Sequence, residues 1–230
     1  MRLITVFKHL VNLFYPNLCA CCRQPLPTGH VLVCVACRMQ LPYTAFDSGT
    51  DNPVVKTFWG RGNIESATTL LYYQKNTVVQ ELLHAFKYRN RTDIANVFGM
   101  EIGKKVHENS SMRTCEALVP VPMHKSKLKT RGYNQSLLLA NEISKVTGQK
   151  INEEILKKEI ITTSQTKKGR FDRWANSGEN FVAVKTPLKH IALVDDVITT
   201  GATIEACIVA LRKENPDIKV SVIALAYTYR

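Results

Sequence analysis

Apolar and polar residues alternate along this chain with two different periods, and their order predicts the fold class. From residue 115 onward, short apolar runs typical of buried strands alternate with segments whose apolar residues recur every three or four positions, as on one face of a helix. Before residue 115 the same signals predict fewer elements. A stretch rich in turn formers, between residues 43 and 63, separates the N-terminal region from the elements that begin at residue 67. Strands that alternate with helices indicate an α/β fold with a mainly parallel sheet flanked by helices.

The individual elements follow from these periods. We predict helices at 1–16, 77–89, 92–106, 134–148 and 203–215, and strands at 67–73, 115–123, 159–163, 180–184, 190–194 and 219–229. The helix at 203–215 shows its apolar face most clearly, at Ile204, Cys207, Ile208 and Leu211. In a parallel sheet, ligands bind beyond the carboxyl ends of the strands, so functional residues are expected after these apolar runs.

The first sixteen residues resemble a signal peptide only superficially. Lys8, His9 and Asn12 interrupt the apolar run, and no small-residue cleavage site follows it. An amphipathic helix that packs on the body or on a partner, and stops at Pro16, fits the pattern better. No segment has the about 20 consecutive apolar residues that a membrane span needs. We therefore expect a cytoplasmic protein that is not an integral membrane protein.

Composition adds a size limit and a class of partner. The chain has 230 residues, of which 45% are hydrophobic, and this suits one ordinary domain with a small appendage. Its formal net charge is +12, from 31 Lys and Arg against 19 Asp and Glu. Such a balance favours an anionic partner such as phosphate or nucleic acid, although a solvated basic surface is the simpler alternative.

Two cysteine pairs predict a metal site near the N-terminus. Cys19 and Cys22 form one C-x2-C pair, and Cys34 and Cys37 form a second after eleven intervening residues. Each pair lets two thiolates face one ion while backbone amides donate to the sulfurs, so that two pairs complete a tetrahedral site suited to Zn²⁺. Four cysteines leave no open coordination position, so we expect a structural zinc ribbon in which residues 31–33 form a short strand.

Other roles for the cysteines are less well supported than zinc binding. Cys21 lies between the two ligands of the first pair and could replace one of them, but its spacing is worse. A redox C-x-x-C pair and local disulfides are the remaining alternatives. An extracellular disulfide framework is disfavoured because five of the seven cysteines are concentrated between residues 19 and 37.

The stretch IALVDDVITTGAT, residues 191–203, carries the strongest chemical signal. We expect the strand to end before Asp195 and Asp196, and Thr203 to open the following helix. Amides at a helix N-terminus bind phosphate, glycine permits close approach of the backbone, and threonine hydroxyls add donors. The phosphate-binding residues expected in this turn are Thr199, Thr200, Gly201, Ala202 and Thr203.

The adjacent aspartates call for a different partner, since carboxylates repel phosphate. Sugar hydroxyls, a divalent metal or both would satisfy them, so the stretch predicts a phosphorylated ribose. The alternative is an ordinary turn with Asp and Thr as helix caps. That alternative explains one Asp and one Thr, but it leaves the pair and the rest of the turn unexplained.

At this point the motifs resemble a known family. VDDVITTGAT (194–203) is similar to the phosphoribosyl-pyrophosphate motif of type I phosphoribosyltransferases. Together with the cysteine pairs, FKYR (86–89), VPVPMHKSKLKTRGYNQS (119–136) and TTSQTKKGRFDRWANSGENF (162–181), it resembles the ComF family over almost the entire chain. The resemblance implies a type I phosphoribosyltransferase-like domain at 116–230, a linker and hood-like α/β segment at 51–115, and an N-terminal helix with the four-cysteine zinc module at 1–50.

The resemblance also suggests roles for the basic segments. Residues 119–136 are similar to a pyrophosphate loop, and residues 162–181 to a mobile loop that closes over the site. These segments and FKYR supply our expected contacts to pyrophosphate or to nucleic-acid phosphate, namely Lys87, Arg89, His124, Lys125, Arg131, Gln165, Arg170 and Arg173. For Lys127 and Lys129, a solvated face is about as good an interpretation.

Two functions follow from the resemblance. The first is a role in DNA uptake during natural competence, with single-stranded DNA as a partner alongside phosphoribosyl pyrophosphate or a nucleotide, and with proteins of the competence machinery as further partners. The second is an active phosphoribosyltransferase that uses phosphoribosyl pyrophosphate and Mg²⁺. Because no nucleophile or base for an acceptor can be identified, the sequence does not decide whether the protein is an enzyme.

Overall fold

The computed structural model describes residues 16–27, 32–46, 52–158 and 181–229. The helix expected at 1–16 and the strand expected at 159–163 lie outside these ranges, apart from Pro16. So do three of the expected phosphate contacts, Gln165, Arg170 and Arg173. In the described ranges, no helix is both long enough and apolar enough to cross a bilayer.

A five-stranded sheet of parallel pairs forms the centre of the molecule, in the order β1-β7-β6-β2-β3. The two central strands, β6 and β7, are rich in small and branched apolar residues and are buried on both faces, as parallel strands usually are. A separate antiparallel pair, β4-β5, lies beside this sheet. The strands are β1 (Ala67–Tyr72), β2 (Ala117–Pro120), β3 (Lys150–Ile151), β4 (Leu156–Lys158), β5 (Phe181–Ala183), β6 (His190–Ile198) and β7 (Lys219–Tyr227).

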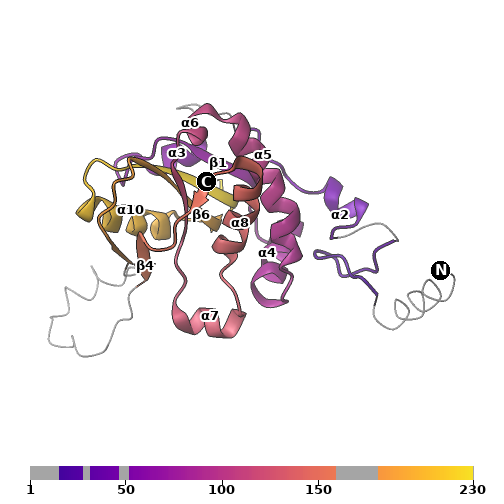
Figure 1. Cartoon of the computed structure of the whole chain (residues 1–230). Coiled ribbons are helices and arrows are strands. Elements are labelled where there is room, and N and C mark those ends of the chain that lie inside the picture. The colour runs from indigo at the N-terminus through magenta and orange to yellow at the C-terminus, as the bar shows by residue number, and fades with distance from the viewer. Residues whose placement is uncertain (1–15, 28–31, 47–51, 159–180, 230) are drawn as a thin grey trace, which may run out of the picture.

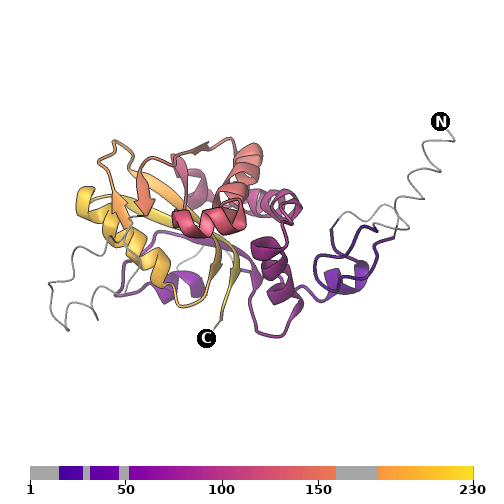
Figure 2. The same ribbon diagram turned by 90° about the horizontal axis from the view of Figure 1, so that it is seen from below.

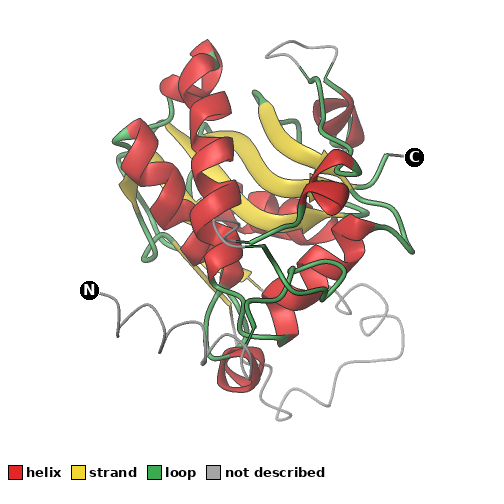
Figure 3. Cartoon of the chain, turned by 90° about the vertical axis from the view of Figure 1, so that its right-hand side faces the viewer, coloured by secondary structure: helices red, strands yellow, loops and turns green. Residues whose placement is uncertain are grey.

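Helices cover both faces of the sheet, as Figures 1 and 3 show. The core has two parts: Ala192 and Val194 of β6 pack with α4, α5 and α8, while Ile191 and Leu193 pack with α3 and α10. This alternation is the period of two expected for a strand. The helices are α2 (Val35–Met39), α3 (Pro53–Thr57), α4 (Val78–Tyr88), the π-helix η1 (Ala95–Gly99), α5 (Met100–Glu108), α6 (Ser110–Arg113), α7 (Lys125–Arg131), α8 (Gln135–Thr147) and α10 (Ala202–Glu214).

The predicted fold class is confirmed: the chain forms a mainly parallel sheet flanked by helices, and a four-cysteine cluster lies near the N-terminus of the chain. β1, α4, β2, α8, β5, α10 and β7 fall where the hydrophobic pattern predicted them. The helix expected at 92–106 is also present, although its first part, η1, has π-helical geometry.

Three local predictions were wrong. β6 does not end before the aspartates but continues to Ile198, because β7 runs alongside it to Tyr227 and supplies ladder partners. The helix after the turn begins at Ala202, with Gly201 as its N-cap, and not at Thr203. Leu32 and Val33 form a bend rather than a strand, because the chain turns there toward α2. The segment that resembles a pyrophosphate loop contains the helix α7, and its role stays a prediction.

The cysteine module packs against α4 and α5, on one face of the sheet. Cys21, Leu32 and Leu41 join the same core as Phe86 of α4. Two polar contacts add to this packing: Arg38 pairs with Glu101 of α5 at 2.5 Å, and the Arg91 guanidinium donates to the Leu18 carbonyl at 2.8 Å. The segment expected as a linker and hood supplies β1 and α4 to the main sheet and core, and the three domain boundaries stay a prediction.

Candidate functional site: a phosphate-type cavity and a four-cysteine cluster

A cavity of about 240 Å³ opens at the carboxyl ends of β2 and β6. Its walls come from α4, the segment around α7, the start of α8, β4, and the turn between β6 and α10. Figure 2 shows α7 in front of the sheet on this side. The lining residues are Lys87, Val121, Pro122, Met123, His124, Lys127, Arg131, Asn134, Gln135, Ser136, Lys158, Asp195, Asp196, Val197, Thr199 and Thr203.

Asp195 is held by two hydrogen bonds to one carboxylate oxygen. Its Oδ1 accepts from the Ser136 hydroxyl at 3.1 Å and from the Asp196 backbone N–H at 2.8 Å. Burial raises the pKa of the Asp195 carboxyl to about 7, and the neighbouring Asp196 carboxylate adds to the rise. Neither hydrogen bond uses the second carboxylate oxygen, Oδ2, so this oxygen is available to a ligand.

Asp196 has a counter-ion within the protein. Its Oδ2 lies 2.9 Å from the Lys87 ammonium, and both side chains are largely buried, with 10% and 20% exposed. Little water screens this ion pair, and removing one partner would leave an uncompensated buried charge. The site therefore combines a fixed carboxylate–ammonium pair with a second carboxyl group that titrates near neutral pH.

The turn after β6 is shaped by one glycine. Gly201 has a left-handed backbone with φ of +79°, and a Cβ there would lie 2.9 Å from the Phe58 ring. Only glycine fits both conditions. Thr199 and Thr203 of this turn line the cavity, while the Thr200 hydroxyl accepts from the Ala202 N–H at 3.3 Å. The N-terminus of α10, a helix of 13 residues, is thus placed beside the cavity, where its dipole favours an anion.

The basic wall is a helix that does not enter the core. None of the residues of α7 is buried, and Figure 1 shows it held away from the body on two connecting segments. His124 is its N-cap, and Gly132, with φ of +80°, ends it. Arg131 lines the cavity and is tied to the α4 wall through the Tyr88 hydroxyl at 3.1 Å.

Of the expected residues that the structure describes, seven line the cavity, namely Lys87, His124, Arg131, Asp195, Asp196, Thr199 and Thr203, whereas Thr200, Gly201 and Ala202 do not. Lys125 is exposed on α7 and does not line it, and Arg89 pairs instead with Glu81 at 3.1 Å. Lys127, Lys158 and Ser136 are lining residues that were not among the expected ones. Lys127 lies two positions after Lys125 in the same basic segment. Neither its charge nor its spacing shows in the sequence that it faces the cavity rather than solvent. Lys158 is brought in by the short strand β4, for which the sequence carried no clear signal.

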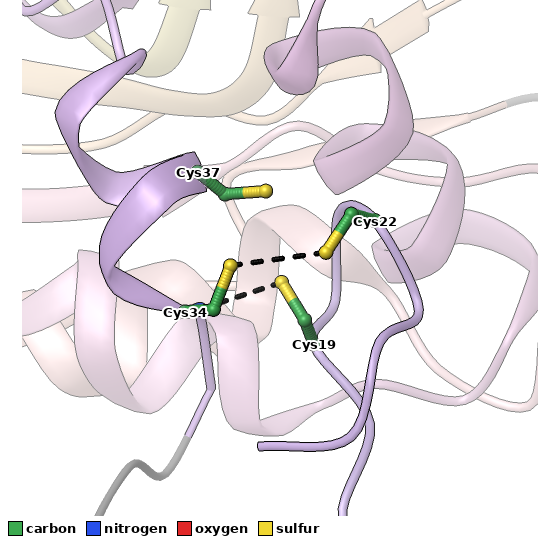
Figure 4. A group of neighbouring side chains, drawn as sticks. All are labelled: Cys19, Cys22, Cys34 and Cys37. Carbon is green, nitrogen blue, oxygen red and sulfur yellow. Dashed lines mark hydrogen bonds between the residues drawn. The ribbon is translucent and has the colours of Figure 1, made fainter. Parts of the chain in front are cut away.

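The four expected zinc ligands form one cluster, shown in Figure 4. The Sγ atoms of Cys19, Cys22, Cys34 and Cys37 all lie within 4.8 Å of one another. Sγ of Cys22 and Sγ of Cys34 are 3.7 Å apart, which is too long for a disulfide. A tetrahedron with Zn–S bonds of about 2.3 Å has edges of about 3.8 Å. The donor set therefore fits a metal such as zinc.

The electrostatics of these thiols fit the same assignment. Burial acts to raise the pKa of the Cys19 thiol, but the N–H groups of Cys34, Cys22 and Cys21 outweigh it and lower the pKa to about 6. Burial, followed by hydrogen bonds to the neighbouring thiols, raises the pKa of Cys37. A divalent cation would supply the charge that lets all four sulfurs ionise together. Burial also raises the pKa of Cys21 to about 12, and Cys21 packs in the core as a neutral thiol outside the cluster.

Comparison with known proteins identifies relatives. The chain is 32% identical over 142 residues to Competence protein F of Haemophilus influenzae, a match that covers 57% of this chain and 61% of that protein. It is 29% identical over 196 residues to Competence protein ComFC of Bacillus subtilis, covering 82% and 75%. It is 25% identical over 202 residues to the DNA utilization protein YhgH of Escherichia coli, covering 82% and 88%.

Two further comparisons add little. No family model matches the chain. Orotate phosphoribosyltransferase from Aeropyrum pernix aligns with 74% of this chain and 79% of its own at 15% identity, with a TM-score of 0.32, which is too low to bear on the fold. The sequence relatives carry the assignment: the chain is a homologue of the ComF-type competence proteins and of YhgH, as its motifs indicated.

Proposed function

We propose that this protein serves DNA uptake in natural competence by handling single-stranded DNA, and that its cavity binds phosphoribosyl pyrophosphate or a nucleotide. The observation that supports the ligand is the convergence on one cavity of Asp195 and Asp196, of Thr199 and Thr203 from the turn after β6, and of the basic side chains Lys127 and Arg131 from α7. The observation that supports the DNA role is the similarity to proteins named for competence and DNA utilization.

In this proposal each part of the cavity has a separate task. Ribose hydroxyls bind Asp195 and Asp196, and the 5-phosphate binds the amides and hydroxyls of Thr199, Thr200, Gly201, Ala202 and Thr203. The pyrophosphate binds the His124 imidazole and the Arg131 guanidinium, which face the cavity, with Lys87 shared between it and Asp196. Gln165, Arg170 and Arg173 complete this set from the segment outside the described residues. Mg²⁺ neutralises pyrophosphate charge when it binds with the ligand.

Single-stranded DNA binds the exposed cations outside the cavity. Lys125 is exposed on α7, whose residues make no core contacts, so its ammonium is free to contact a DNA phosphate. Arg89 is the second contact in this proposal, although its side chain is only 25% exposed and a DNA phosphate would have to compete there with Glu81. The net charge of +12 supplies the long-range attraction. Titrating a fluorescent oligonucleotide at two salt concentrations tests this: affinity should fall with salt by a log–log slope of about −0.7 per phosphate contacted. No binding, or binding that ignores salt, would refute the DNA role.

A second candidate function is phosphoribosyl transfer to an unknown acceptor. It is favoured by the cavity, which holds paired carboxylates and several cations at one sheet edge. The sequence identifies no nucleophile or base for an acceptor. Incubation with phosphoribosyl pyrophosphate, Mg²⁺ and a panel of bases and amines should release pyrophosphate if this activity exists. If no compound of the panel causes release of pyrophosphate, the transferase activity is refuted for these acceptors.

The remaining assignments complete the proposal. Zn²⁺ has a structural role at the four cysteines, where it ties α2 to the first cysteine pair and so to the core. Proteins of the competence machinery are expected partners, and the cytoplasm is the expected location. Metal analysis of the purified chain tests the zinc assignment, with one equivalent expected.

A further inference from the structure

The residues shortly before β1 form a buttress behind the turn at 199–203, called the phosphate turn below. The sequence patterns did not predict this contact. This buttress, residues 52–63, consists of α3 and the turn that follows it. The Phe58 ring is fully buried and occupies the space that a side chain at residue 201 would need. Arg61 reaches the same turn, where its Nη1 donates to the Thr200 carbonyl at 3.1 Å.

The buttress is itself anchored at several points. The Arg212 guanidinium of α10 donates to the carbonyls of Gly62 and Asn63, each at 2.7 Å. The Tyr227 hydroxyl of β7 lies 2.8 Å from the Thr57 hydroxyl. A segment tied to the helix and the strand next to it has little freedom to move away from the turn. The backbone that carries Arg61 is therefore held in place relative to the turn.

Arg61 approaches the turn from outside the cavity. Of the described residues, those that line the cavity include Thr199 and Thr203 but not Arg61. Its contact is to a carbonyl, and a turn that binds an anion must point its N–H groups inward and its carbonyls away. By accepting from Arg61, the Thr200 carbonyl is held on the outer side. Its negative end is kept from the ligand.

Arg61 also forms an ion pair with Glu205, in the first turn of α10. A carboxylate at that position interacts favourably with the helix dipole, so it competes with an anionic ligand for the same positive end. The side chains of Arg61 and Glu205 are 40% and 32% exposed. The guanidinium offsets the Glu205 charge and leaves the helix N-terminus available.

From these contacts we infer that Arg61 is a positioning residue for the phosphate turn, which it prepares for a phosphomonoester such as ribose 5-phosphate by fixing the Thr200 carbonyl and neutralising Glu205. The inference rests on the proposed function of the cavity. It adds a residue that the ligand itself does not touch. It also explains why the turn needs support from a segment about 140 residues earlier in the chain, since Arg61 and Thr200 are separated by 139 positions.

The test compares ribose 5-phosphate and phosphoribosyl pyrophosphate binding by calorimetry in wild type and four variants. Arg61→Met should weaken binding on the order of tenfold, because it removes one charge-assisted hydrogen bond and one neutralising charge. Arg61→Lys should recover part of the loss. Adding Glu205→Gln to Arg61→Met should restore the part due to charge, which a purely structural role of Arg61 would not allow. Arg38→Met is the matched control, since Arg38 is similarly exposed and also pairs with a glutamate.

The outcomes separate this inference from the proposed function. If wild type binds neither ligand, the proposed function fails. If wild type binds and Arg61→Met binds within twofold of it, or loses no more than Arg38→Met, the role of Arg61 is overturned while the cavity's function stands. Should Arg61→Met fail to fold, Glu205→Gln alone decides: equal or tighter binding supports the inference, and weaker binding overturns it.

Discussion

Replacing Asp195 by asparagine should make the protein more stable at neutral and alkaline pH, although the residue lies in the functional site. The substitution keeps the oxygen that accepts from Ser136 and from the Asp196 N–H, so the local hydrogen bonds survive. It removes only the ionisable oxygen. Burial has raised the pKa of this carboxyl from 3.8 to about 7, so folding makes its ionisation unfavourable.

The sign and size of the effect follow by linkage. Folded Asp195 binds its proton more tightly than unfolded Asp195, so the stability of wild type falls as pH rises from about 4 to about 7 and is level above that. Each pH unit in this range costs about 1.4 kcal/mol. Between pH 5.5 and 8, the stability difference between Asp195→Asn and wild type should therefore grow by about 2 kcal/mol in favour of the variant.

Urea unfolding of both proteins at several pH values, in buffer without added Mg²⁺, measures this difference. Subtraction removes the contribution of every group that titrates equally in the two proteins. A difference that stays constant from pH 5.5 to 8 would mean that Asp195 is an ordinary ionised carboxylate. In that case the raised pKa assigned to the Asp195 carboxyl would be wrong.

Four further substitutions probe the rest of the structure. Lys87→Met should cost about 3 kcal/mol in the free energy of unfolding, because it leaves a buried carboxylate unpaired; a loss below about 1 kcal/mol, measured by urea unfolding, would contradict a buried pair. Cys37→Ser should lose the metal, whereas Cys21→Ser should keep one equivalent of zinc by elemental analysis, and the reverse result would assign the wrong ligands. Gly201→Ala should lower the melting temperature and weaken sugar-phosphate binding, since it combines backbone strain with a clash costing about 2 kcal/mol or more; unchanged melting would disprove that requirement.

The fold could be predicted from the sequence because its strands and helices have strong periods. The runs that became β6 and β7 are apolar on both faces, and the apolar stripe of α10 is regular. The cysteine cluster was equally predictable, because ligand spacing is a local property of the chain. The end of β6 was not, since strand length depends on a neighbour that lies about thirty residues away, as the pairing of Ile198 with Tyr227 shows.

The site was predictable only in part, for a similar reason. Asp195, Asp196 and the turn after them occur in one continuous stretch, so their chemistry is visible in the sequence. Lys158 and Ser136 reach the cavity through tertiary packing. Arg89 carries the charge that a phosphate site needs, but it forms an ion pair with Glu81, eight residues earlier in the chain. No local pattern distinguishes such a residue from one that faces the ligand.

The most direct test of the account is calorimetric titration of the zinc-loaded protein with phosphoribosyl pyrophosphate and Mg²⁺. We predict saturable binding near one equivalent, and its loss in the double variant Asp195→Asn/Asp196→Asn with zinc content unchanged. Absence of binding to wild type, or binding that the double variant retains, would contradict the assignment of this cavity.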